Sequence, residues 1–227
     1  MFKNFLSFWS GKDFLSQILE DFNKMQEETK QMFTDVLSKL LESKEEKGLK
    51  DKIYSLDKRV NELEREIRKR IVEHLSVQPT IDVPACLLMM SVVKDSERIG
   101  DYCKNLYEVT ELLQGSLDKT RFGGLFDNMD RQLVEEFDKT IGAFKNSDAQ
   151  LAKDVLNIET GIVKNCDDIL KKLSKSDLRT NEAVCYTLMA RYFKRIAAHL
   201  ANIGSSVILP ISDLDFFDEK LRREKAL

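Results

Sequence analysis

The chain has 227 residues and a formal net charge of −3, from 36 basic and 39 acidic side chains. This near balance argues against the basic surface that binds nucleic acid, so no nucleic-acid partner is expected. Charged residues make up 33% of the chain and hydrophobic residues 42%, with only nine Gly and three Pro. Such a composition is typical of long amphipathic helices and not of sheets or disordered segments.

The first twelve residues form an N-terminal aromatic segment. Its apolar side chains share one helical face and are Phe2, Phe5, Leu6 and Trp9. Such a face favours a peripheral contact with a membrane or a transporter. The alternative of equal weight is that the segment covers the open end of the first helical bundle, because an exposed aromatic cluster needs covering.

Apolar residues spaced by three and four predict two helices after this segment. The first extends over residues 13–42 and the second over residues 53–75, with a charged turn at residues 44–50 between them. Both helices alternate apolar with charged positions, so each has one face to bury.

A third helix is expected after Pro79, which blocks continuation of the second helix. Asp82 is expected to cap its N-terminus, and Pro84 fits the first turn, where an amide proton needs no partner. Its apolar heptad seam consists of Val92, Ile99, Leu106 and Leu113. A seam of this length needs two partner helices, which the first two helices supply.

The second half of the chain repeats this plan. Gly123 and Gly124 punctuate the sequence and place the boundary between the halves within residues 120–125. Three further helices are expected, over residues 133–144, 151–173 and 176–209. Residues 213–227 are expected to form a tail that is loosely packed or paired with a partner.

A displacement of 97 residues relates the two halves. Arg98-Ile99-Gly100 with Asn105-Leu106 returns as Arg195-Ile196-Ala197 with Asn202-Ile203. An internal duplication of this kind predicts an all-α fold of two tandem three-helix bundles. The expected units are a segment 1–12, a first repeat 13–120, a second repeat 127–212 and a tail 213–227.

The four cysteines form neither a CxxC pair nor a closely spaced set; they are Cys86, Cys103, Cys166 and Cys185. They are expected to be reduced fillers of the core, as in a cytoplasmic protein. No stretch of the sequence approaches the roughly 18 apolar residues of a membrane-spanning helix.

Two sets of oxygen-bearing side chains follow a spacing of four and three. The second helix carries Asp57, Asn61 and Glu64, and the third carries Glu97, Asp101, Asn105 and Glu108. This spacing puts each set on one face of its helix, and side-by-side packing of the helices brings the two sets together. Repulsion among their carboxylates is relieved by protonation or by a bound cation.

Ordinary ion pairs explain the same pattern without a ligand. Glu64 can pair with Arg68, and Glu66 with Arg70, each pair contributing about 0.2–0.5 kcal/mol. If a metal ion binds, oxygen donors without nearby Cys or His suit iron(III), manganese, magnesium or calcium better than structural zinc. A bound metal ion and ordinary ion pairs are therefore both open for these residues.

The same residues resemble a known family. Residues 97–101 read Glu-Arg-Ile-Gly-Asp and are followed by Asn105 and Glu108, which resembles the E-R-I-G-D-x-x-x-N-x-x-E signature of PhoU proteins, the phosphate-uptake regulators. Residues 57–64 resemble the helix-two motif of these proteins, and the Gln-Pro-Thr of residues 78–80 with Asp82 also matches. The resemblance implies a duplicated three-helix bundle with carboxylate-bound iron or zinc clusters on its surface.

The second repeat departs from this signature. Lys194 and Ala198 stand where the motif has its two acids, and an ammonium at Lys194 repels a cation. A second site is therefore expected to be degenerate and to use Asp154, Glu159, His199 and Asn202.

The resemblance implies a cytoplasmic, non-enzymatic regulator of phosphate uptake that binds metal ions. Iron is the metal expected before the others. The implied partners are a membrane phosphate transporter, through an ATPase subunit or as a Pit-type permease, and a phosphate-sensing histidine kinase. Homo-oligomer formation is a further expectation. Two other functions remain open: a metal-independent helical adaptor, and a carboxylate-bridged metal hydrolase, for which the sequence shows no evident substrate cleft.

Overall fold

A computed structural model describes residues 13–42 and 47–214. The aromatic segment 1–12 and most of the tail 213–227 therefore lie outside the described residues. The described residues form seven α-helices, one short 3-10 helix and no strand. They are α2 (Asp13–Glu42), α3 (Leu49–Val77), α4 (Val83–Leu112), α5 (Lys119–Phe126), α6 (Met129–Asn146), α7 (Ala149–Leu173), α8 (Thr180–Ser205) and η1 (Ile211–Asp213).

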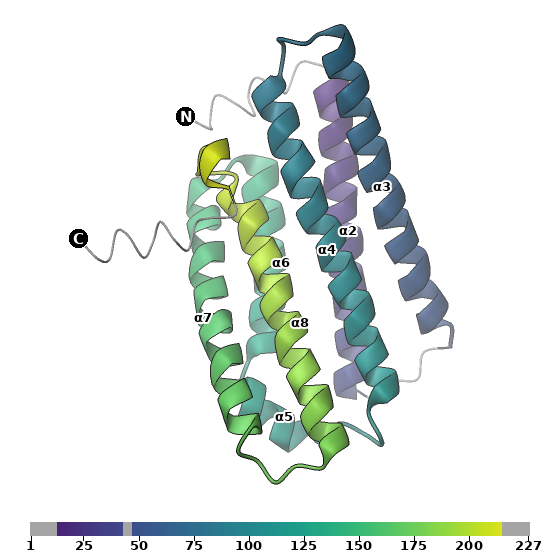
Figure 1. Cartoon of the computed structure of the whole chain (residues 1–227), viewed down its shortest axis with the longest axis vertical. Coiled ribbons are helices and arrows are strands. Elements are labelled where there is room, and N and C mark those ends of the chain that lie inside the picture. The colour runs from purple at the N-terminus through teal and green to yellow at the C-terminus, as the bar shows by residue number, and fades with distance from the viewer. Residues whose placement is uncertain (1–12, 43–46, 215–227) are drawn as a thin grey trace, which may run out of the picture.

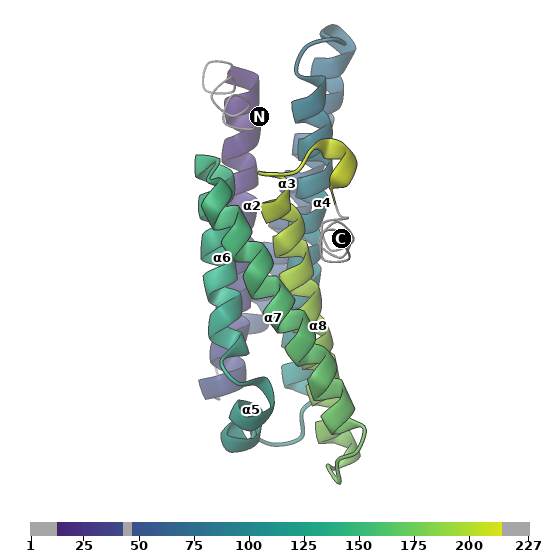
Figure 2. The ribbon, with the colours of Figure 1, turned by 90° about the vertical axis from the view of Figure 1, so that its left-hand side faces the viewer.

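Two three-helix bundles stand side by side with their long axes roughly aligned (Figures 1 and 2). Helices α2, α3 and α4 form the first bundle, and α6, α7 and α8 form the second. The bundles meet along α4 and α8 and, on the other side, along α2 and α6. This architecture confirms the all-α tandem bundle that the duplication predicted.

One hydrophobic core continues from the first bundle into the second. Phe22 of α2 packs edge-on against Phe144 of α6, with ring centroids 4.8 Å apart. Phe33 of α2 contacts Phe137 of α6 at 5.3 Å and Phe193 of α8 at 6.1 Å. Aromatic rings of this size bury large apolar areas, so they join the repeats into one body.

The short helix α5 was not predicted, because its sequence contains Gly123 and Gly124, which disfavour helices. The side chain of Asp118 caps it by accepting a hydrogen bond from the amide of Arg121 at 3.0 Å. Phe122 and Phe126 lie one turn apart, stack on each other at 4.6 Å and are both buried. Burial of these two rings offsets the low helix propensity of the glycines.

The predicted start of the last helix at Ser176 or Asp177 is wrong, because α8 begins at Thr180 and ends at Ser205. The hydroxyl of Ser176 donates to the carbonyl of Leu173 at 2.8 Å and so belongs to the end of α7. Serine side chains commonly make such local bonds to the backbone, and these compete with helix initiation.

The prediction that Asp82 caps α4 with its side chain is also wrong. Asp82 has φ of 61° and its side chain makes no cap hydrogen bond. Its carboxylate lies instead 3.3 Å from Nε2 of His74, whose ring stacks on Phe14 at 4.0 Å. Pro84 does occupy the first turn of α4, as expected. All four cysteines are free and buried, which fits their prediction as core fillers.

Gly204 of α8 allows close contact with α7. A Cβ at this position would lie 2.9 Å from Cγ1 of Val155 and 3.2 Å from its Cβ. Valine is stiff at χ1 and cannot swing aside. We expect Gly204→Ala to lower the free energy of unfolding by about 1–3 kcal/mol in urea denaturation.

Gly161→Ala on α7 is the matched control, because a Cβ there meets no atom within 4 Å. This change should raise the free energy of unfolding by about 0.5–1 kcal/mol through helix propensity alone. Equal stabilities for Gly204→Ala and Gly161→Ala would show that α7 and α8 are not held at this distance.

None of the helices formed by residues 13–42 and 47–214 has both the length and the apolar character needed to cross a bilayer.

Candidate functional site

The predicted carboxylate cluster lies along the contact between α3 and α4. These helices pack closely where Gly100 faces Val60, since a Cβ on Gly100 would lie 3.6 Å from the Val60 side chain. The apolar faces of both helices are buried in the core, so the intervening polar residues line the seam at its outer edge. Asp57 and Glu97 consequently lie on the same side of the bundle.

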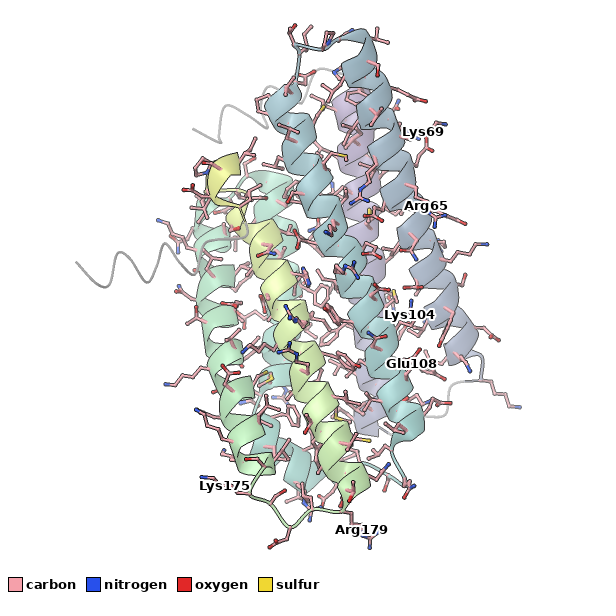
Figure 3. The ribbon with its side chains drawn as sticks, in the orientation of Figure 1. Arg65, Lys69, Lys104, Glu108, Lys175 and Arg179 are labelled. Carbon is pink, nitrogen blue, oxygen red and sulfur yellow. The ribbon has the colours of Figure 1, made fainter. Side chains whose placement is uncertain are left out.

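Lys104 bridges the two helices within this seam, and Figure 3 shows it one turn from Glu108 on the side of α4 beside α3. Its ammonium donates to Asp57 of α3 at 2.8 Å and to Asp101 of α4 at 3.2 Å. Burial alone would lower the pKa of Lys104, but the hydrogen bonds and charges of the two aspartates raise it. The lysine is therefore held in its charged form.

Arginines accompany the other carboxylates of the seam. Glu64 pairs with Arg68 at 2.9 Å, and Arg98 lies 3.6 Å from Glu97 and 3.3 Å from Asp101. Helix spacing alone predicted the pair of Glu64 and Arg68 and also the pair of Glu66 and Arg70, which lies at 2.9 Å.

Glu97 is a half-buried acid of the seam beside Arg98. Burial, followed by the charges of Asp101 and Glu64, raises its pKa, and Arg98 offsets only part of this effect. Contacts through cationic side chains link the two predicted sets: Lys104 contacts Asp57 of α3 and Asp101 of α4, and Arg98 lies between Glu97 and Asp101.

The remaining predicted residues occupy the same faces. Tyr54 of α3 donates its hydroxyl to exposed Glu108 of α4 at 2.9 Å. Asn61 and Asn105 are half-buried, one on each helix. The seam thus consists of ion pairs and hydrogen bonds that hold α3 and α4 together at the surface.

The side chains as they lie do not fit a metal ion. Among residues 13–42 and 47–214, no group of three or more His, Cys, Asp or Glu side chains converges as metal ligands do. A bound cation needs several oxygens directed at one point. Here the ammonium of Lys104 occupies the position between Asp57 and Asp101.

Of the four residues predicted for a second site, the structure brings together only His199 and Asn202. Asp154 accepts from Lys139 at 3.1 Å at the surface. Glu159 is buried, and its charge acts on Glu136 of α6. His199 and Asn202 point instead toward the first bundle.

His199 and Asn202 of α8 both contact Asp95 of α4. The distances to the same carboxylate oxygen are 2.7 Å from His199 Nδ1 and 3.0 Å from Asn202 Nδ2. Since a carboxylate only accepts, Nδ1 of His199 carries the proton. The ring of His199 also stacks on Tyr102 at 5.7 Å. These side chains form a polar contact between the bundles.

Sequence reasoning missed Tyr54, Lys104 and Asp95. Lys104 lies three residues after Asp101, a spacing that signals an ion pair on a helix and could have been read. Asp95 belongs to the first bundle but pairs with residues more than 100 positions later. No local pattern reveals a partner at that distance.

Fold and site together define a tandem three-helix-bundle protein with an interlocked charged seam on its first repeat. The sequence matches the PhoU domain model twice, over residues 22–110 and 126–207, and the chain belongs to the PhoU family. This result confirms the resemblance inferred from the motifs.

Solved structures agree in fold. The chain is similar to PhoU from Pseudomonas aeruginosa, with a TM-score of 0.75, 20% identity and coverage of 88% of this chain and 97% of that one. It is also similar to the phosphate transport system regulatory protein PhoU from Streptococcus pneumoniae, with a TM-score of 0.74, 16% identity and coverage of 89% and 95%. No curated protein sequence matches the chain significantly.

Proposed function

We propose that this chain regulates phosphate uptake from the cytoplasmic side of the membrane by docking to a phosphate transporter, without catalysing a reaction. The observation that carries the proposal is the double match to the PhoU domain. It is supported by the structural likeness to a protein described as a phosphate transport system regulator. Docking would act by blocking the transporter or by favouring one of its conformations.

The surface proposed for docking is the part of the α3–α4 seam formed by Tyr54, Asp57, Asp101, Lys104 and Glu108. Tyr54 is 40% exposed although its hydroxyl is bonded to Glu108. A tyrosine held in place by a hydrogen bond is a rigid, amphipathic contact, and such residues contribute strongly to interfaces. Alternating fixed charges around it favour one partner orientation.

The proposed occupant is the ATPase subunit of the transporter, and a Pit-type permease or a sensor kinase would be tested by immobilising that protein in place of the subunit. We expect Tyr54→Ala/Glu108→Ala to weaken binding to the immobilised subunit roughly tenfold or more in surface plasmon resonance. Asp168→Ala/Lys171→Ala is the control, because it removes an exposed ion pair from α7. Binding that is identical for both double variants would exclude the seam.

The adaptor alternative predicts a different result with the same assay. It assigns binding to the N-terminal aromatic segment, so Phe5→Ser/Trp9→Ser should then abolish association while Tyr54→Ala/Glu108→Ala leaves it intact. A further readout is phosphate uptake in cells that lack the chain and are complemented with each variant. Uptake that does not respond to the chain at all would overturn the regulatory function itself.

Metal binding by the seam stays a prediction from the sequence. It is no part of the docking proposal, because the seam is held together by its own side chains. The titration described below tests it directly.

A further inference from the structure

We propose that Lys104 is the resident cation of the α3–α4 carboxylate cluster, defined as Asp57, Glu64, Glu97 and Asp101, and that it keeps this cluster from binding a divalent metal ion. The sequence predicted a metal ion among these carboxylates, whereas the structure places the ammonium of Lys104 between Asp57 and Asp101. The inference does not rest on the docking proposal.

Lys104 occupies the space that a metal ion between the two helices would need. The Lys104 ammonium lies 2.8 Å from an oxygen of Asp57 and 3.2 Å from an oxygen of Asp101, so it contacts one carboxylate on each helix. A metal ion that joined α3 to α4 through these acids would need the same space. Lysine supplies only hydrogen-bond donors, so it cannot share that space as a ligand.

The ion pairs of Lys104 with Asp57 and Asp101 are partly buried. The side chains of Lys104 and Asp57 are 22% and 13% exposed, and that of Asp101 is 29% exposed. Coulomb attraction between groups shielded in this way exceeds that of a fully exposed pair. An ion from solution therefore competes with a cation that is already attached to the chain.

Cationic side chains nearly balance the negative charges of the cluster. Three cationic side chains contact the four carboxylates, namely Lys104, Arg68 and Arg98. Only one negative charge is left formally uncompensated. A divalent ion entering the cluster would leave it with net positive charge unless a cationic side chain withdrew.

The consequence is a surface whose shape and charge do not depend on metal supply. Lys104 holds α3 and α4 together from within the chain, as a bound cation would from outside. The charged seam is then present whenever the protein is folded.

The test is a titration with Mn²⁺, followed by electron paramagnetic resonance, of the full chain and of Lys104→Met. Methionine keeps much of the length and packing of lysine but removes its charge. We expect the variant to bind one Mn²⁺ roughly tenfold more tightly than the natural chain, the effect of one unit charge removed a few ångströms from a divalent ion. Adding Asp57→Asn to Lys104→Met should cancel the gain.

Lys194→Met is the matched control. Lys194 of α8 is 25% exposed and pairs with Asp167 at 2.6 Å, so it resembles Lys104 in burial but serves a single carboxylate. This variant should bind Mn²⁺ no better than the natural chain. A gain equal to that of Lys104→Met would assign the effect to general charge and overturn the proposal.

Two further results would also overturn it: unchanged Mn²⁺ affinity in Lys104→Met, or stoichiometric metal in the natural chain when it is purified without chelators and subjected to elemental analysis. If Lys104→Met does not fold, Lys104→Gln and Lys104→Arg decide the question. Glutamine removes the charge and should increase the affinity, whereas arginine retains it and should not. Equal affinities for these two variants would exclude the role of the Lys104 charge.

Discussion

Replacing Glu136 by methionine is expected to stabilise the protein, by about 1–4 kcal/mol near pH 7. Glu136 of α6 is fully buried, and neither of its carboxylate oxygens has a hydrogen-bond partner among the described residues. Burial, followed by the charge of Glu159, raises its pKa well above the usual value. An apolar side chain of similar length removes this cost and retains most of the packing.

The stabilisation should depend on pH in one direction. Below the pKa of the unfolded chain, near 4.5, Glu136 is protonated in both states, and only the smaller cost of burying a neutral carboxyl group remains. As the pH rises from there toward the higher folded-state pKa, the unfolded chain releases the proton first, and the natural protein loses stability relative to Glu136→Met. The difference between the two free energies of unfolding should therefore grow between pH 5 and pH 8 in urea denaturation.

Glu135→Met is the control, because Glu135 is 57% exposed and lies 3.5 Å from Lys139. Its effect should stay within about 0.5 kcal/mol at every pH. If Glu136→Met destabilises the protein, or if its effect is flat with pH, then the carboxylate of Glu136 is ionised and stabilised in the folded state.

Removing the carboxylate of Asp95 is expected to destabilise the protein, in contrast to the stabilisation expected for Glu136→Met. Asp95→Ala should lower the free energy of unfolding by about 2–4 kcal/mol, because it leaves the polar atoms of His199 and Asn202 without their acceptor. Asp95 is 7% exposed, so water replaces the lost contact poorly. Urea denaturation gives the magnitude, and hydrogen exchange should show faster opening of α8 around residue 199.

Asp95→Asn tests whether the acceptor oxygen or the negative charge matters. The amide oxygen can still accept from both partners, so the loss should be smaller than for alanine. In a double-mutant cycle, Asp95→Ala combined with His199→Ala should cost less than the sum of the two single changes. Strictly additive losses would mean that the two residues do not interact across the bundles.

Helix positions were largely readable from the sequence, because the apolar spacing of three and four is local information. The first helix was predicted over residues 13–42, and α2 has these bounds. Errors arose where contacts that the apolar periodicity does not record outweighed helix propensity. Burial of Phe122 and Phe126 makes a helix across two glycines, and a hydroxyl bond to Leu173 moves the start of α8.

The composition of the site was readable in part. The motif residues of α3 and α4 were named, and in the structure Lys104 joins Asp57 of α3 to Asp101 of α4. The sequence did not indicate Lys104 as the counter-ion of these acids, because this lysine falls at a position that the motif leaves unspecified. For the second repeat, sequence displacement identified Asn202 as the equivalent of Asn105, and His199 was expected as a replacement ligand, but the partner of both residues lies on the other bundle.

The sequence by itself determined the class of fold, the duplication and the family, since helical periodicity and repeated motifs are recorded along the chain. Tertiary structure alone decided what the polar side chains do. Whether an acid meets a metal ion, a lysine or a histidine depends on which helix faces it, and that is set by packing of apolar faces. Asp57 therefore meets Lys104 across α3 and α4, and Asp95 meets His199 across the two bundles.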